Sequence, residues 1–137
     1  MSLQKAELSE ADLVIYRWIK EWLIPQTWEK SPNGSTDGIK PQKIVEILPL
    51  LKKTSAAVQL ANFEFGIVRT SDPSPAETDE MTFFFCLAAS ESSKIGTTTL
   101  VEDEAYWVTG TVWLYPQTSL LYMRPKKSEA VAEPIAE

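Results

Sequence analysis

The first strong pattern along the chain consists of apolar residues that recur every three or four positions between residues 10 and 23. They are Ala11, Ile15, Trp18, Ile19 and Trp22. This is the 3.6-residue period of an amphipathic helix, so the sequence predicts a helix there. Ser9 offers a hydroxyl to the amide of Asp12, and the Asp12 carboxylate can reach back, as in a capping box. Pro25 ends the helix, because the residue before a proline is pushed out of helical conformation.

The next segment, residues 25–40, is rich in proline, glycine and other turn-forming residues and predicts a long loop. Trp28 lies in this loop, and we expect its ring to pack back on the domain. Pro41 suits the first position of a second helix, where its missing N–H costs nothing. Pro49 would break a hydrogen bond inside that helix, so we expect a kink or a restart at residue 49.

From residue 56 onward the pattern changes to the alternation of apolar and polar residues that is typical of half-buried strands. We expect strands over residues 57–70, 81–89, 94–101, 105–115 and 118–124. The second of these reads MTFFFCLAA and is apolar on both faces, which predicts a central strand. Residues 71–76 are rich in serine and proline, so they predict a turn-rich connection.

Helices followed by a run of strands predict an α+β fold. We expect two N-terminal helices packed on one face of an antiparallel sheet of about five strands. Residues 1–125 would form this single α+β domain. Residues 126–137 contain mainly Ala, Glu, Pro and Lys, and they predict a disordered acidic tail.

The amino-acid composition argues against several kinds of function but does not identify one. The 137 residues carry 13 Lys and Arg against 19 Asp and Glu, for a net charge of -6, which repels nucleic acid at long range. The chain has no histidine, so the commonest general base and metal ligand is missing. It has one cysteine, which fits a reducing, cytoplasmic location. We expect no cofactor, no metal site and no membrane-spanning segment.

The sequence gives only weak evidence for a catalytic group of residues, so we do not favour an enzymatic function. Cys86 lies in the expected central strand, where burial makes a thiol inert. Residues 102–104 (Glu-Asp-Glu) form an acidic cluster, which is typical of a solvated hairpin turn. The glycines form none of the known phosphate-binding patterns.

The most informative feature is an aromatic and hydroxyl-bearing face on the strand at 105–115. Alternation puts one set of side chains on this face: Trp107, Thr109, Thr111, Trp113 and Tyr115. Tyr122 and Arg124 could extend it on the next strand. The opposite set is more uniformly apolar (Tyr106, Val108, Gly110, Val112 and Leu114), so we expect it to face the helices. Half-polar faces with Trp and Tyr are enriched at protein interfaces.

These observations favour a non-catalytic protein–protein interaction module, such as an accessory subunit, assembly factor or adaptor. Its partner would be another protein or a second copy of the chain. The aromatic face could instead be covered by residues 25–40 or by a homodimer. One alternative function is a subunit of a nucleoprotein complex, using Arg124, Lys126 and Lys127. Another is a small-ligand domain with a pocket between sheet and helices, with polar contacts from Glu64, Arg69 or residues 102–104.

Overall fold

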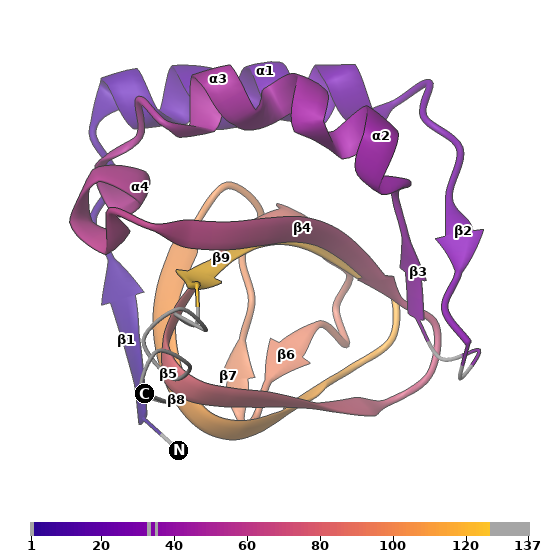
Figure 1. Ribbon diagram of the computed structural model, residues 1–137. Helices are drawn as coiled ribbons and strands as arrows, with labels where there is room; N and C mark the ends of the chain where they lie inside the picture. The colour runs from indigo at the N-terminus through magenta and orange to yellow at the C-terminus, as the bar shows by residue number, and fades with distance from the viewer. Residues whose placement is uncertain (1, 33, 35, 127–137) are drawn as a thin grey trace, which may run out of the picture.

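The computed structural model describes residues 2–32, 34 and 36–126, and nine strands form one antiparallel sheet (Figure 1). The strands are β1 (Ser2–Ala6), β2 (Glu29–Lys30), β3 (Thr36–Gly38), β4 (Phe63–Thr70), β5 (Ser74–Ala88), β6 (Lys94–Ile95), β7 (Thr98–Thr99), β8 (Ala105–Leu114) and β9 (Thr118–Pro125). The helices are α1 (Glu10–Leu23), α2 (Pro41–Ile44), the 3-10 turn η1 (Val45–Ile47), α3 (Leu48–Leu51) and α4 (Ser55–Leu60).

The strands follow the order β2-β3-β4-β9-β5-β8-β6-β7, and β1 pairs with the free side of β8. Figure 1 shows the helices lying across one side of the sheet, while the sheet curls strongly on itself on the other side. The hydroxyl of Thr70, at the end of β4, donates to the carbonyl of Tyr115, which follows β8. This bond joins the end of β4 to the segment that follows β8, although β4 and β8 are not neighbours in the sheet order.

The predicted fold class is wrong. Two helices on a five-stranded sheet describe neither the number of strands nor the shape of the sheet. Three strands were missed because they are short or polar, so that alternation cannot reveal them. They are β1, in the polar N-terminal segment before α1, and β2 and β3, in the loop expected at residues 25–40. The expected turn at 71–76 is also wrong, because β5 already begins at Ser74.

The sequence signals for the start of α1 and for the restart at Pro49 are confirmed. The role expected of Asp12 and the start of the strand expected at 57–70 are wrong. The helix α1 begins after Ser9, whose hydroxyl accepts the amide of Asp12 at 3.1 Å. The Asp12 carboxylate does not close the capping box: it is buried and accepts the amide of Ser55, which joins α1 to α4. Pro49 restarts the chain in α3 as expected. The expected strand at 57–70 is helical in its first part, which is α4.

Two apolar cores lie on opposite faces of the sheet. The core under the helices includes Tyr16 and Phe85, whose ring centroids lie 4.4 Å apart. The second core lies inside the curl of the sheet and includes Tyr106 and Val108. The prediction that Tyr106 and Val108 face the helices is therefore wrong. On β8 it is Trp107 that packs on the helix-side core.

The expected tail at 126–137 falls mostly on residues 127–137, which lie outside the described residues. Lys126 is described, and its amide donates to the carbonyl of Asn62 beside the start of β4. The extent of the domain, residues 1–125, stays a prediction. Among the helices of the described ranges, none combines the length and apolar character needed to cross a membrane.

Candidate functional site

A hollow of about 710 Å³ extends around an open edge of β4, from the inner side of the curled sheet to the helix side. We define it by six of the residues that line it: Gly66, Val68, Thr82, Phe84, Leu114 and Tyr122. It forms where one edge of β4 is not paired with another strand. The short β3 pairs only with residues 68–70, so residues 63–67 have no strand partner on that side within the described part of the chain. Around this open edge the cavity continues to Phe65 and Ile44 on the helix side.

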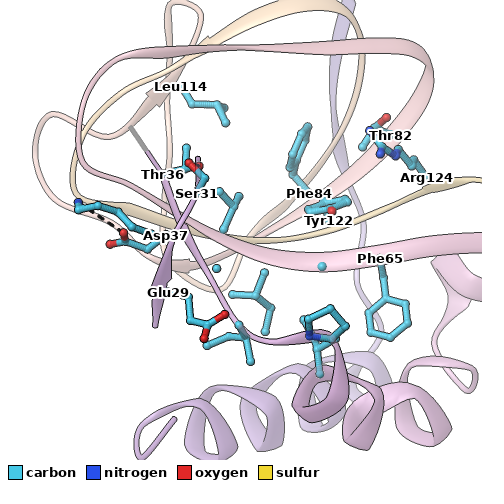
Figure 2. Close-up of a pocket in the computed structure, with 18 of the residues that line it drawn as sticks. Glu29, Ser31, Thr36, Asp37, Phe65, Thr82, Phe84, Leu114, Tyr122 and Arg124 are labelled. Atoms are coloured by element: carbon cyan, nitrogen blue, oxygen red, sulfur yellow. Dashed lines mark hydrogen bonds and ion pairs between the residues drawn. The ribbon is translucent and has the colours of Figure 1, made fainter. Parts of the chain in front are cut away.

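The floor of the hollow is apolar and aromatic. Phe84 on β5 and Tyr122 on β9 are register partners, and Figure 2 shows them together on one side of β4. Phe65 points to the other side of β4, toward the helices (Figure 2). Val68 and Leu114 belong to the same inner core as these two rings. A concave surface of this kind is typical of small-molecule sites.

Gly66 makes room for the ring of Tyr122, its partner across the β4–β9 ladder. A Cβ at residue 66 would lie 2.6 Å from the Tyr122 oxygen and 2.8 Å from two ring carbons. The ring therefore lies against the bare backbone of β4. Burial raises the pKa of Tyr122, so its phenol stays protonated at neutral pH and can donate a hydrogen bond.

Three threonines add hydroxyl groups around the apolar floor. Thr82 donates to the carbonyl of Glu80 at 3.1 Å, beside the point where the register of β5 against β8 shifts. Thr78 donates to the carbonyl of Gly110, and Thr36 donates to the hydroxyl of Ser31. Since each hydroxyl already uses its proton, all three remain hydrogen-bond acceptors.

Charged side chains lie at the two ends of the hollow (Figure 2). Arg124 lies at the end near Thr82, with its guanidinium 5.6 Å from the Tyr122 ring centroid and its Nε bonded to Glu64. At the opposite end, Asp37 accepts two hydrogen bonds from Arg69, at 2.9 and 3.2 Å. The bonds from Arg69 lower the pKa of Asp37, so this carboxylate stays ionised and paired at neutral pH.

The end with Asp37 is further fixed by Trp28. The Arg69 guanidinium lies 4.3 Å from the centroid of the Trp28 ring, and that ring packs on the helix-side core. The expectation that Trp28 packs back on the domain is confirmed. The Arg69 guanidinium thus stacks on the Trp28 ring and is hydrogen-bonded to Asp37 on β3. These contacts hold β2 and β3 beside the hollow.

The acidic cluster at 102–104 is not simply a solvated turn. Lys20 of α1 contacts Glu102 at 2.6 Å and Asp103 at 2.7 Å, and Lys5 of β1 contacts Glu104 at 3.0 Å. Burial works against the charge of Lys20, but the hydrogen bonds to the two acids outweigh it and raise its pKa. These ion pairs hold α1 and β1 to the loop before β8. Nowhere in the described ranges do three acidic, His or Cys side chains gather as metal ligands would.

The structure splits the predicted binding face into separate places. Tyr122 and Arg124 line the hollow. Trp107 is half-buried on the helix side, and its ring centroid lies 5.2 Å from that of Phe83. The other four predicted residues do not line the hollow. Of these, Thr111 and Trp113 are exposed, whereas Thr109 and Tyr115 are half-buried.

The separation of Tyr122 and Arg124 from the Trp107 face follows from the strand register. Tyr106 on β8 pairs with Phe84 on β5, and Phe84 pairs with Tyr122 on β9, so Tyr122 shares the inner face with Tyr106 and not the face of Trp107. The alternation on β8 continues across Gly110, because Val108 before it and Leu114 after it both belong to the inner core. Sequence reasoning also missed Gly66, Val68 and Phe84. The one available signal was Gly66, because a glycine inside an alternating strand often marks a close approach.

No protein-family model, curated protein or solved structure matches this chain.

Proposed function

We propose that this protein binds a small, largely apolar molecule in the hollow without acting on it chemically. One observation carries this proposal: a cavity of about 710 Å³ has an aromatic floor and hydroxyl groups at its edges. Small-molecule sites are typically ~300–1,000 Å³ and mostly apolar, with a few polar groups that orient the ligand. The charged groups at the two ends are held in ion pairs, which favours binding over acid–base catalysis.

The proposal modifies one alternative drawn from the sequence. That alternative expected a pocket between the sheet and the helices. Part of the hollow does lie on the helix side, at Ile44 and Phe65, but its aromatic floor, formed by Phe84 and Tyr122, belongs to the inner core of the curled sheet. Neither Glu64 nor residues 102–104 line the cavity, so they would not supply the polar contacts expected of them.

The test is binding of the neutral, polarity-sensitive dye Nile red to variants with a filled hollow. Val68 is half-buried on the inner face, so Val68→Trp would place an indole in the cavity. Val58→Trp is the matched control, because Val58 is 70% exposed on α4 and does not line the hollow. We expect the wild type and the control to bind the dye, and Val68→Trp to bind at least about tenfold more weakly.

A second filling variant guards against misfolding of the first. A Cβ at residue 38 would lie 3.5 Å from the carbonyl oxygen of Ile67, which is an ordinary contact, so Gly38→Val should fold. Gly38 lines the hollow, and its replacement should also weaken dye binding. The proposal is overturned if the folded wild type does not bind, or if folded filling variants bind as well as the wild type.

Trp113 favours a second candidate function, the protein–protein interaction module indicated by the sequence. Its side chain is 49% exposed, and exposed indoles are common anchors of protein interfaces. If Trp113 is such an anchor, Trp113→Ala should weaken partner binding by about 2 kcal/mol and leave the fold intact. The partner would be another protein or a second copy of this chain, as measured by co-purification and by sedimentation.

We also propose a cytoplasmic location. The support is the lone Cys86, which is buried and unpaired, as thiols usually are in reducing compartments. Fractionation of the source cells tests this directly, and recovery of the protein outside the cytoplasm would contradict it.

A further inference from the structure

We propose that the molecule bound in the hollow is an amphiphile with a carboxylate head, and that Arg124 binds this head. The inference rests on the proposed function, because it names the chemical class of ligand for the same hollow. It is carried by the position of Arg124, by the hydrogen bonds its guanidinium leaves open, and by the pairing of the charges at the opposite end.

The guanidinium of Arg124 has unused donors. Its Nε donates to Glu64, and no hydrogen bond joins its two terminal nitrogens to an acceptor within the described residues. A guanidinium presents its donors in a planar fork that matches the two oxygens of a carboxylate. Arg124 can therefore keep its bond to Glu64 and still bind a carboxylate head.

The direction of the pair also favours an anionic ligand. Arg124 lines the hollow, whereas its partner Glu64 does not. The guanidinium lies over the Tyr122 ring, so a head bound there leads directly onto the apolar floor formed with Phe84. The ligand would thus lie with its head at the Thr82 end and its chain across the two rings (Figure 2).

The opposite end is unsuited to an anionic head. The cation that lines it, Lys30, lies 3.7 Å from Asp37, which is also bonded to Arg69. Glu29 lines the same end and is 3.3 Å from Lys40. An anion there would meet two carboxylates that line the hollow, Glu29 and Asp37, whereas Glu64, the carboxylate paired with Arg124, does not line it.

The experiment compares three eight-carbon ligands by titration calorimetry: octanoate, 1-octanol and octylamine. Each ligand is kept below the concentration at which it forms micelles or separates from water. Arg124→Gln removes the cation at the Thr82 end of the hollow. Lys126→Gln is the matched control, because Lys126 is an exposed cation that does not line it. Since a charge-assisted hydrogen bond adds about tenfold in affinity, octanoate should bind the wild type about tenfold more tightly than octanol.

Each outcome separates this inference from the proposed function. We expect Arg124→Gln to bind octanoate and octanol equally and Lys126→Gln to keep the preference for octanoate. Added salt should weaken the binding of octanoate but not that of the uncharged octanol. Equal binding of octanoate and octanol by the wild type, or a preference that survives Arg124→Gln, overturns the role of Arg124 but leaves the hollow as an apolar site. If no eight-carbon ligand binds, both the inference and the proposed function fail.

Discussion

The ring of Tyr122 on β9 lies against the backbone of Gly66 on β4, so closely that a single added methyl group would overlap it. The oxygen and two ring carbons of Tyr122 are 2.6 to 2.8 Å from the position of that missing Cβ. The two residues face each other in the ladder between the strands. This contact fixes the floor of the hollow, because the Tyr122 ring can pack against the β4 backbone only where residue 66 has no side chain.

Gly66→Ala should therefore destabilise the protein by about 1–3 kcal/mol, which is typical of overpacking at a tightly packed site. Urea unfolding measures this cost. In a Tyr122→Ala background the same change should cost little, because the overlapping ring is gone and alanine suits a strand better than glycine. An equal cost in both backgrounds would mean that the ring and the backbone are not in contact.

The two tryptophans of β8 should respond oppositely to truncation. Trp107 packs edge-on against Phe83 in the helix-side core, so Trp107→Ala should cost about 2–3 kcal/mol in the free energy of unfolding. Trp113 is 49% exposed, so Trp113→Ala should change the stability by no more than about 0.5 kcal/mol. Denaturant unfolding of both variants tests this. A loss at Trp113 as large as that at Trp107 would show that the exposed indole is part of the core.

The buried hydroxyl of Tyr16 forms no hydrogen bond of normal geometry among the residues described. The Tyr16 ring stacks on Phe85, and burial raises the pKa of its phenol. The Thr54 hydroxyl, which is bonded to Leu51 and Ala57, nevertheless lies close enough to lower the Tyr16 pKa in part. Because an unsatisfied buried hydroxyl costs about 1–3 kcal/mol, Tyr16→Phe should leave the stability unchanged or increase it. Thr54→Ala is a useful comparison, since the Thr54 hydroxyl caps α4 and its loss should cost about 1 kcal/mol. A clear loss on Tyr16→Phe would reveal a partner for the hydroxyl.

Cys86 should be unreactive in the folded protein. Burial raises the pKa of its thiol to about 12, so almost no thiolate is present near neutral pH. Iodoacetamide at about pH 8 should label the unfolded chain and spare the native one. The raised pKa also stabilises the fold at neutral pH, and this contribution should fade as the pH rises from the unfolded thiol's value toward 12. Rapid labelling of the native protein would contradict the buried position.

Local signals in the sequence predicted the elements that depend on neighbouring residues. Ser9 and Pro25 marked the ends of α1, and Pro49 marked the restart at α3. The single strand expected at 94–101 is wrong, because the chain turns at residues 96 and 97 and forms the paired short strands β6 and β7 instead. The strands β2, β6 and β7 have two residues each, too few for any alternation, and they are stabilised by pairing with a neighbouring strand. Propensity cannot reveal such strands, since the ladder that stabilises them is non-local.

The candidate site was even less accessible to sequence reasoning. Tyr122 and Arg124 were selected as an extension of the Trp107 face, yet they lie on the inner face, away from Trp107. The hollow depends on how far β3 extends along β4 and on how strongly the sheet curls. Both properties come from contacts between distant segments, whereas the period of two along each strand reports only that two faces exist.

The most direct test of a binding site inside the curled sheet is an amide NMR titration with the neutral ligand 1-octanol. Occupation of the hollow predicts the largest shifts at Gly66, Val68, Phe84 and Tyr122, and small shifts at Trp113 and along α1. Shifts confined to Trp113 or α1, or no shifts at all, would contradict it.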